Sequence, residues 1–461
     1  MPNMSQFKTP VPVQKASDRK SNYGEVELGY TLEQAKTEAD RCLRCSHAPC
    51  KKMCPVNVSI PEFIECISNN ETDNALKIIM KTNALPAICG RICPQENQCE
   101  GTCVRGVKGE PVAIGRLERY VADNGRYYDG KKATPNGMKM AVVGSGPAGL
   151  SCANTLCEMG YTVTVFEAFH IPGGVLSYGI PEFRLPKDIV NEEIERLIKK
   201  GVTIETNIII GKTMTIDNLF EEEYKAVFIG TGAGLPSFLG IEGENLNGVF
   251  SANEFLTRMN LMKAHENEYD TPVIKGKSIA VIGGGNVAMD AARSALRLGY
   301  EKVYIIYRRS MDEIPARRDE IHHAAEEGVI FEILSMPVRI INDGNGWVNG
   351  IECVKVELKE LDESGRCSPA EIKDSNYIVE ADTIIIAIGQ SPNPLVGKAT
   401  PALDVDRKGC IITDESLLSS ITGVYAGGDS VTGAATVIQA MGAGVNAAIA
   451  MDEYVRVTEK E

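Results

Sequence analysis

The sequence predicts an α/β protein in which a helical N-terminal domain precedes two Rossmann-like dinucleotide-binding domains, the second inserted in the first. Two observations support this prediction. Glycine-rich loops at 144–149 and 283–288 each lie between an apolar β-branched run and a helical pattern, and two runs of four cysteines lie within residues 42–103. We expect the helical domain over 1–125, the first dinucleotide domain over 138–255 and 381–461, and the inserted domain over 256–380.

The composition is that of a globular protein with a full core, with 43% hydrophobic and 24% charged residues. A length of 461 residues allows about three domains. The net charge of −14 argues against nucleic acid and against an anionic membrane surface as partners. The polar start of the chain has no signal-peptide pattern, and no apolar run is long enough to span a membrane, so we expect a cytoplasmic protein. Its 14 cysteines then indicate metal binding rather than disulfides.

The first 125 residues have helical patterns. Thr31 and Gln34 form the capping-box sequence of one helix start, and Pro61 stands in the first turn of another helix. A turn-rich segment at 128–137 predicts an interdomain linker. Beyond it, the order strand, glycine loop, helix, strand occurs twice, which predicts parallel sheets with helices on both faces. These two units span 138–167 and 277–309.

The cysteines read Cys42-x2-Cys45-x4-Cys50-x3-Cys54-Pro55 and Cys89-x3-Cys93-Pro94-x4-Cys99-x3-Cys103. Soft thiolates packed this densely favour iron–sulfur clusters, which move electrons singly. A zinc ribbon could also use Cys-x2-Cys, but the longer gaps and the Cys-Pro pairs fit zinc less well. In two-cluster ferredoxins the cysteine before proline binds the other cluster, so we expect Cys54 to leave the first run.

The residues at the end of the second strand of each unit indicate which dinucleotide that unit binds. Glu167 follows Gly149 by 18 residues, where a carboxylate can accept hydrogen bonds from ribose hydroxyls. The second unit has Arg308 and Arg309 at this place, and paired guanidinium groups favour a 2′-phosphate. The first site therefore suits FAD and the second suits NADPH. Ala288, which replaces the third glycine in the second loop, agrees with this assignment.

Further segments support a flavin in the first domain. Glycines at 172–184 follow Glu167, and glycine turns at 229–233 and 387–389 each follow a β-branched strand. The segment Gly427-Gly428-Asp429 resembles the closing motif of a flavin domain, which is why the second unit is expected to be inserted in the first. Arg317 and Arg318 either add charge to the NADPH pocket or lie on a solvated face.

Together these motifs resemble the small (beta) subunit of NADPH-dependent glutamate synthase. The resemblance rests on the two glycine loops, Gly-Ile-Pro-Glu-Phe-Arg-Leu-Pro-Lys187, Tyr-Arg-Arg309 and Gly-Gly-Asp429, all behind a twin-cysteine domain. The N-terminal part of dihydropyrimidine dehydrogenase and the large subunit of the NADH-dependent ferredoxin–NADP oxidoreductase resemble the same module. The similarity runs from about residue 25 to the C-terminus.

The resemblance implies that NADPH passes a hydride to FAD and that electrons leave singly through two 4Fe–4S clusters. It implies FAD-binding residues at Gly144, Gly146, Pro147, Ala148, Gly149, Glu167, Gly173, Gly174, Arg184, Gly428 and Asp429. It implies NADPH-binding residues at Gly283, Gly285, Asn286, Val287, Ala288, Arg308, Arg309 and Arg317. We expect no acid–base catalyst, because hydride transfer needs only correct positioning of the two rings.

The resemblance also implies that the two cysteine runs interleave. One cluster takes Cys42, Cys45, Cys50 and Cys103, and the other takes Cys54, Cys93, Cys99 and Glu118. Cys89 is expected to pack in the core, because the family position is often not cysteine. A carboxylate ligand should change the potential of its cluster.

The expected function is that of the electron-input subunit of glutamate synthase, whose larger partner makes glutamate from glutamine and 2-oxoglutarate. Asn286-Val287 departs from the Asp-Thr common in that family and favours an alternative. In this alternative the chain is the large subunit of an electron-bifurcating NADH-dependent ferredoxin–NADP oxidoreductase, with a smaller ferredoxin-reductase-like partner. A disulfide reductase is disfavoured because Cys152 and Cys157 diverge by about 140° on a helix. The intact loops disfavour a non-enzymatic binding module.

Overall fold

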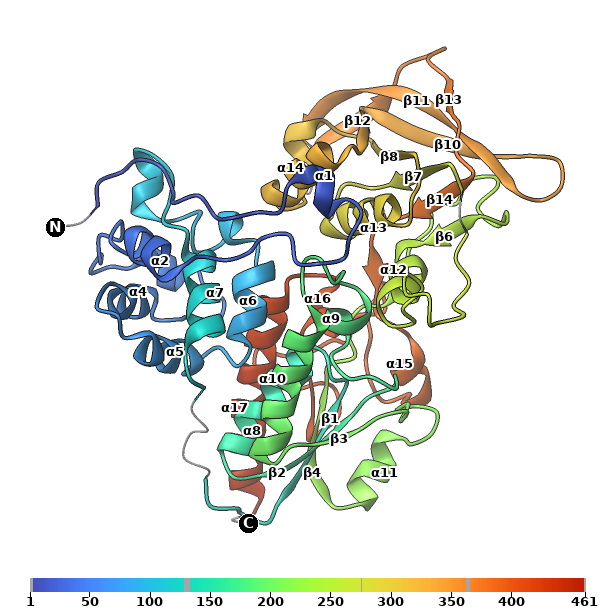
Figure 1. Cartoon of the computed structure of the whole chain (residues 1–461). Coiled ribbons are helices and arrows are strands. Elements are labelled where there is room, and N and C mark those ends of the chain that lie inside the picture. The colour runs from blue at the N-terminus through green and yellow to red at the C-terminus, as the bar shows by residue number, and fades with distance from the viewer. Residues whose placement is uncertain (1–2, 128–132, 275, 362–364, 460–461) are drawn as a thin grey trace.

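A computed structural model describes residues 3–127, 133–274, 276–361 and 365–459. Figure 1 shows the helical domain in blue and cyan beside two units that each contain a parallel sheet. The domain consists of α1 (Ala16–Arg19), α2 (Leu32–Ala39), α3 (Pro49–Lys52), α4 (Ile60–Ser68), α5 (Thr72–Met80), α6 (Pro86–Ile92) and α7 (Ile114–Asn124), with 3-10 turns η1 (Gln95–Asn97) and η2 (Val104–Val107). The predicted capping box of Thr31 and Gln34 is present at the start of α2, and Pro61 stands in the first turn of α4. Of the predicted linker, residues 128–132 lie outside the described residues.

The first sheet has the parallel order β16-β4-β1-β2-β3. Its strands are β1 (Lys139–Val143), β2 (Thr162–Phe166), β3 (Thr203–Glu205), β4 (Tyr224–Ile229) and β16 (Val424–Ala426). Its helices are α8 (Pro147–Glu158), α9 (Val175–Tyr178), α10 (Lys187–Lys200), α11 (Ile216–Glu221), α15 (Leu395–Ala399), α16 (Asp429–Thr432) and α17 (Val437–Thr458). Because β16 comes from the end of the chain, the intervening segment forms the inserted unit that the sequence predicts.

The second sheet has the parallel order β6-β14-β7-β8-β9. Its strands are β6 (Val249–Ser251), β7 (Ser278–Ile282), β8 (Lys302–Tyr307), β9 (Ile330–Ile333) and β14 (Thr383–Ile386), and its helices are α12 (Ala252–Asn260), α13 (Asn286–Arg297) and α14 (Arg318–Glu327) with the turn η3 (Met311–Glu313). An antiparallel sheet of β10 (Ser335–Asn342), β11 (Val348–Leu361), β12 (Cys367–Glu371) and β13 (Tyr377–Val379) packs beside it. Two short strands, β5 (Leu235–Pro236) and β15 (Gln390–Ser391), pair where the chain crosses between the units.

The second sheet extends beyond the range 256–380 expected for the inserted domain. Strand β6 begins at Val249 and β14 ends at Ile386, and both pair within this sheet. A short buried strand has the same composition whichever sheet it joins, so its local sequence does not identify its partner. The pairing of β14 with β7 decides the boundary.

Helix α17 joins the helical domain to the first dinucleotide unit. It packs along α8, and a Cβ atom at Gly444 would lie 2.1 Å from the carbonyl oxygen of Ala148. The buried residues of the helical domain and of this helix pair form one continuous core. In the part of the chain that the structure describes, no helix is long and apolar enough to cross a membrane.

Candidate functional site

The first glycine loop, between β1 and α8, leaves open space on one side only. A Cβ at Gly149 would lie 1.9 Å from the carbonyl oxygen of Gly144, so the start of α8 packs directly on the loop. A Cβ at Gly146 would meet no atom within 4 Å. Pro147 is the first residue of α8 and Ala148 is buried. This arrangement places the open side of the loop at a helix N-terminus, which suits a pyrophosphate.

Glu167 lies at the end of β2 and points into this loop. Its buried carboxylate accepts hydrogen bonds from the backbone N–H groups of Ser145 and Phe169, each at 2.9 Å, and from the Ser145 hydroxyl. The N–H of Gly173 donates to the same hydroxyl at 2.9 Å. The predicted ribose acceptor is therefore held at the loop through Ser145, whose hydroxyl is in turn held by the backbone of Gly173.

Residues from two more segments close the same site. Gly174 has a φ of +55°, and a Cβ there would lie 2.9 Å from the Cα of Gly146. A Cβ at Gly428 would lie 3.0 Å from the Cβ of Ala148. The next residue, Asp429, has no cationic partner in the described chain, and burial raises the pKa of its carboxyl to about 6. This convergence fits FAD, because close backbone approach and a carboxylate surround one open space.

The second glycine loop, between β7 and α13, repeats this geometry. A Cβ at Gly283 would lie 2.2 Å from the carbonyl oxygen of Ala387, whereas a Cβ at Gly285 would meet no atom within 4 Å. Asn286 is the first residue of α13, Val287 packs on the core of this unit, and Ala288 is fully buried in that core. The space beside Gly285 is therefore the counterpart of the space beside Gly146.

The two arginines predicted to bind a 2′-phosphate have different surroundings. Arg308 is exposed at the end of β8 and makes no hydrogen bond or ion pair with any residue the structure describes. Arg309 is 4% exposed, and its Nε donates to the carbonyl oxygen of Cys367 at 2.8 Å. Arg308 is thus the one of the pair whose guanidinium faces solvent at this strand end.

Arg317 and Arg184 bridge between parts of the chain. The backbone N–H of Arg317 donates to Asn286 Oδ1 at 3.0 Å, but its guanidinium donates to the Arg91 carbonyl at 2.6 Å and to Gln95 Oε1 at 3.0 Å in the helical domain. The guanidinium of Arg184, predicted to bind FAD, is buried against α13 of the second unit. Its contacts therefore lie with the inserted unit.

Four cysteines line one pocket of the helical domain. Three come from the first run and the fourth comes from the second: Cys42, Cys45, Cys50 and Cys103. Apolar side chains such as Ile60 and Ile64 form the rest of the wall. Burial, followed by the neighbouring thiols of Cys103 and Cys42, raises the pKa of the Cys50 thiol to about 11. Four converging thiols in an apolar wall fit an iron–sulfur cluster.

A second group forms around Glu118. Burial and then the Glu118 carboxylate raise the pKa of the Cys54 thiol to about 11. Burial, followed by Glu100, Glu118 and Cys93, raises the pKa of the Cys99 thiol. Burial raises the pKa of Glu118 itself to about 7. Cys89 is buried beside Cys93, so it also lies in this group. In the described ranges, no set of three or more His, Cys, Asp or Glu side chains is arranged around a single metal ion.

Two side chains that the sequence did not indicate contact this second group. Asn83 is fully buried, and its Nδ2 donates to Glu118 Oε1 at 2.7 Å. The Sδ of Met441, on α17, lies 3.5 Å from the Sγ of Cys89. Neither residue belongs to a motif, and both reach the group only through packing of distant segments.

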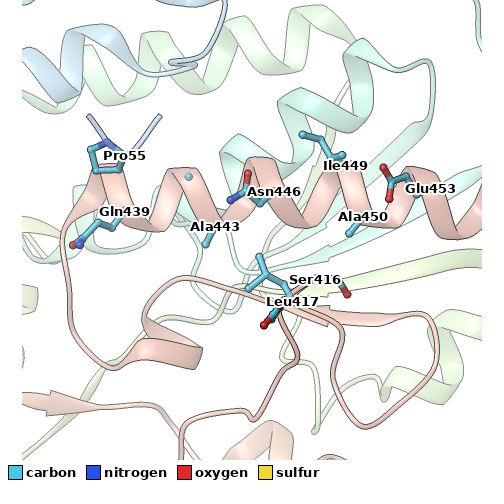
Figure 2. Close-up of a pocket in the computed structure, with 11 residues that line it drawn as sticks. Pro55, Ser416, Leu417, Gln439, Ala443, Asn446, Ile449, Ala450 and Glu453 are labelled. Atoms are coloured by element: carbon cyan, nitrogen blue, oxygen red, sulfur yellow. The ribbon is translucent and has the colours of Figure 1, made fainter. Parts of the chain in front are cut away.

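Helix α17 also forms one wall of a groove of about 390 Å³, shown in Figure 2. Pro55, which follows Cys54, lies at one end, and Ser416 and Leu417 lie opposite the helix. A Cβ at Gly442 would lie 3.1 Å from the carbonyl oxygen of Pro55. The groove therefore adjoins the second cysteine group rather than either glycine loop.

Comparison with known proteins follows this division. A family model described as dihydropyrimidine dehydrogenase domain II, 4Fe-4S cluster, matches residues 19–129, and the pyridine nucleotide-disulphide oxidoreductase model matches residues 138–444. Among solved structures, Mycobacterium tuberculosis FprA in complex with NADPH has a TM-score of 0.60 and 20% identity over 70% of this chain and 86% of that chain. At this identity the likeness concerns the fold alone.

Two curated relatives match most of the chain. The glutamate synthase (NADPH) small chain of Escherichia coli is 35% identical over 442 residues, which is 93% of both chains. The NADP(+)-dependent formate dehydrogenase subunit beta of Moorella thermoacetica is 39% identical over 437 residues, which is 89% of this chain and 60% of that protein. This chain therefore spans about three fifths of the Moorella relative.

These matches confirm the predicted fold class and the predicted cofactor types: FAD, NADPH and 4Fe–4S clusters. They favour iron–sulfur clusters over zinc, because the 4Fe-4S model covers both cysteine groups. The individual ligands and the number of clusters stay predictions. The chain belongs to the family of glutamate synthase (NADPH) small chains, a family of pyridine-nucleotide-dependent oxidoreductases with an N-terminal iron–sulfur domain.

Proposed function

We propose that this chain is the electron-input subunit of a glutamate synthase. Its FAD accepts a hydride from NADPH, and single electrons then pass through two 4Fe–4S clusters to a larger partner. The partner makes glutamate from glutamine and 2-oxoglutarate. The observation that carries the proposal is the sorting of the cysteines into two neighbouring groups, with Cys103 beside Cys42 and Cys50 and with Cys54 beside Glu118. The four thiols of the first group and the four expected ligands of the second, which are Cys54, Cys93, Cys99 and Glu118, match two clusters.

The order of electron transfer follows from one helix. A Cβ at Gly428, in the flavin site, would lie 3.3 Å from the Cβ of Ala440 on α17. The next residue on this helix is Met441, which contacts Cys89 in the second cysteine group. Two adjacent residues of α17 therefore contact the flavin site and the second group. We infer that electrons pass from the flavin to this group and then to the group that contains Cys103.

The face around the first group supports a partner at this end. Its cysteines are flanked by three exposed apolar side chains, which are Leu43, Val104 and Val107. Residues 1–125 carry 16 Lys and Arg against 15 Asp and Glu, in a chain whose net charge is −14. An apolar, locally non-acidic face near a cluster suits docking of an electron acceptor.

The residues of this chain act by binding and orientation. The loops at Gly146 and Gly285 receive the two pyrophosphates, Glu167 accepts hydrogen bonds from the ribose in the adenosine half of FAD, and Arg308 binds the 2′-phosphate. FAD, when bound, supplies the conversion between two-electron and one-electron transfer. No side chain needs to exchange a proton with the nicotinamide ring, because hydride transfer depends on positioning.

The alternative function, as the large subunit of an electron-bifurcating NADH-dependent ferredoxin–NADP oxidoreductase, is favoured by Asn286. This residue replaces an aspartate common in glutamate synthases, and its Oδ1 accepts the hydrogen bond from Arg317 N–H. An amide at this position leaves the pyrophosphate loop without a negative charge. The two functions share the same electron path within this chain and differ in the partner.

The test is anaerobic reduction of the purified chain by NADPH. We expect bleaching of the flavin absorbance, then EPR signals of two reduced 4Fe–4S clusters. The chain is next combined with each candidate partner, a large glutaminase–FMN subunit or a small ferredoxin-reductase-like flavoprotein. NADPH oxidation that requires glutamine and 2-oxoglutarate supports the glutamate synthase role. NADPH oxidation that requires NAD+ and ferredoxin would instead support the alternative.

A further inference from the structure

A single buried amide fixes the carboxylate of Glu118, the one predicted cluster ligand that is not a thiol. Glu118 lies on α7, and its Oε1 accepts a hydrogen bond from the Nδ2 of Asn83 at 2.7 Å. Asn83 is fully buried in the segment between α5 and α6. Among the residues that the structure describes, no other group forms a hydrogen bond or an ion pair with this carboxylate. Asn83 therefore decides where one of the two carboxylate oxygens lies.

The orientation of this amide is itself fixed. The backbone N–H of Leu85 donates to Asn83 Oδ1 at 2.9 Å, and the Sγ of Cys89 lies 3.7 Å from the same oxygen. An amide side chain has its acceptor at one end and its donors at the other. Because a backbone N–H can only donate, the oxygen must face Leu85 and the nitrogen must face Glu118. The contact with Glu118 is therefore a hydrogen bond that the amide donates and the carboxylate accepts.

The two helices that carry these groups are in backbone contact. Figure 1 shows α6 beside α7 in the helical domain. A Cβ at Gly90, on α6, would lie 2.5 Å from the backbone nitrogen of Arg119, the residue after Glu118. A side chain at Gly90 would therefore force the helices apart. Packing of α6 on α7 thus sets the position of Glu118 relative to Cys89 and Cys93, which stand on α6 and at its end.

The amide distinguishes the two candidates for the eighth cluster ligand. Its donor end faces Glu118, and its oxygen faces Cys89. A negatively charged ligand is stabilised beside an N–H donor, whereas a carbonyl oxygen repels it. A carboxylate at Glu118 is thus favoured over a thiolate at Cys89. The contact also restrains a side chain with several rotatable bonds, which would otherwise lose conformational entropy when it binds iron.

We propose that Asn83 is a positioning residue, which holds one oxygen of Glu118 and leaves the other free to bind iron of the second cluster. This inference rests on the proposed function, in which the second cysteine group holds a 4Fe–4S cluster, and on the predicted ligand role of Glu118. Asn83 itself binds no iron. It orients a metal ligand through a hydrogen bond, as the partners of metal-binding carboxylates commonly do.

A purely structural role for Asn83 predicts different results. Its Oδ1 accepts from an N–H two residues further on, so Asn83 forms a turn before α6. A serine hydroxyl can form the same turn, but it is too short to reach Glu118. If only the turn mattered, Asn83→Ser would behave as the wild type, and Asn83→Ala would have the same effect with or without Glu118. A positioning residue changes the cluster only while Glu118 is present.

The experiment is a redox titration of the anaerobically purified chain with its clusters bound, followed by EPR. Iron content and Tm are measured in parallel for every variant. The variants are Asn83→Ser, Asn83→Ala, Glu118→Ala and the double variant that combines Asn83→Ser with Glu118→Ala. Asn74→Ala is the matched control, because Asn74 is exposed on α5 of the same domain and donates to the carboxylate of Glu71 at 3.0 Å.

We expect Asn83→Ser and Asn83→Ala to change the EPR line shape and to lower the midpoint potential of the cluster that Glu118→Ala also perturbs. The potential falls because a hydrogen bond to a ligand stabilises the reduced, more negative cluster, and this bond is lost. The affinity of that cluster for iron, measured by competition with a chelator, should fall about 10- to 100-fold. The other cluster should keep its wild-type values, and so should both clusters of Asn74→Ala.

Two comparisons separate positioning from stability. Tm should fall more in Asn83→Ala than in Asn83→Ser, since serine keeps the turn. In the Glu118→Ala background, Asn83→Ser should cause little further shift of the potential, because the carboxylate through which Asn83 acts is gone.

Four results would overturn the inference: wild-type EPR and potential in Asn83→Ser, a change in the cluster that Glu118→Ala leaves untouched, an equal shift of potential with and without Glu118, or unchanged clusters in Glu118→Ala. Should Asn83→Ala fail to fold, Asn83→Ser carries the same test. Should Glu118→Ala lose one cluster outright, Asn83→Ser is expected to lose iron from that cluster, and full iron content with wild-type EPR would contradict the inference. A wild-type chain in which NADPH reduces no cluster would instead overturn the proposed function itself.

Discussion

The choice of NADPH over NADH is predicted to depend on Arg308 rather than on Arg309. The sequence pattern predicts the same role for both arginines, but only Arg308 presents its guanidinium to solvent at the end of β8. Arg309 is buried and donates to the Cys367 carbonyl. Replacing Arg308 by alanine therefore removes a free cation, whereas replacing Arg309 removes a hydrogen bond that holds the segment after β8 to β12.

The size of the effect follows from the interaction removed. A hydrogen bond to a charged group contributes about 1.5–3 kcal/mol, and about 1.4 kcal/mol corresponds to a tenfold change. We therefore expect Arg308→Ala to lower kcat/KM for NADPH roughly 10- to 150-fold, mainly through KM. The value for NADH should change less than about twofold, because NADH has no 2′-phosphate. Arg309→Ala should instead lower stability, by about 1–3 kcal/mol.

The assay is dye reduction by the FAD-loaded chain with NADPH or NADH as donor, with thermal unfolding measured in parallel. Lys302→Ala is the matched control, because it removes one exposed positive charge from β8 of the same unit. Any general effect of net charge appears in this control as well. Equal losses for NADPH and NADH in Arg308→Ala would refute the reasoning, as would an unchanged preference for NADPH.

Three other predictions follow from the site. Gly146→Ala should fold normally but lose FAD, because its Cβ enters the open space of the loop. Gly149→Ala should fail to fold stably, because its Cβ would lie 1.9 Å from a carbonyl oxygen. Measurements of FAD content and circular dichroism distinguish these two outcomes. Glu118→Ala should change the EPR signal of one cluster while Cys89→Ala keeps full iron content, and a cluster missing from the cysteine variant would reverse the ligand assignment. Asp429→Asn should stabilise the FAD-free protein more at pH 8 than at pH 4. The difference in the free energy of unfolding should be about 2–3 kcal/mol, and it is measured as a larger rise in Tm at pH 8. The reason is that a carboxyl whose folded pKa is about 6, above its unfolded value, stabilises the fold below the unfolded pKa and loses that contribution as pH rises through about 6.

The local sequence was sufficient to predict the strands, glycine loops and helices at which we expect the nucleotides to bind. Each glycine loop lies between its own strand and its own helix, and Glu167 and Arg308 follow the second strand of each unit. These relations involve neighbouring residues whose geometry is set by backbone periodicity, so a single sequence contains them. The capping box at Thr31 is predictable for the same reason. The insertion of one unit in the other also followed from the order of motifs.

Tertiary structure decided what lies between those elements. The joining of Cys103 to the first cysteine run depends on the packing that brings η2 and α4 to the same pocket, and the sheet to which β14 belongs depends on its pairing with β7. Arg184 stands in a segment close to the flavin loop along the chain, yet its partner Asp290 lies 106 residues away. The physical reason is the same in each case. Periodicity and turn chemistry act over a few residues, whereas a buried charge or thiol takes its partner from whichever distant segment packing brings beside it.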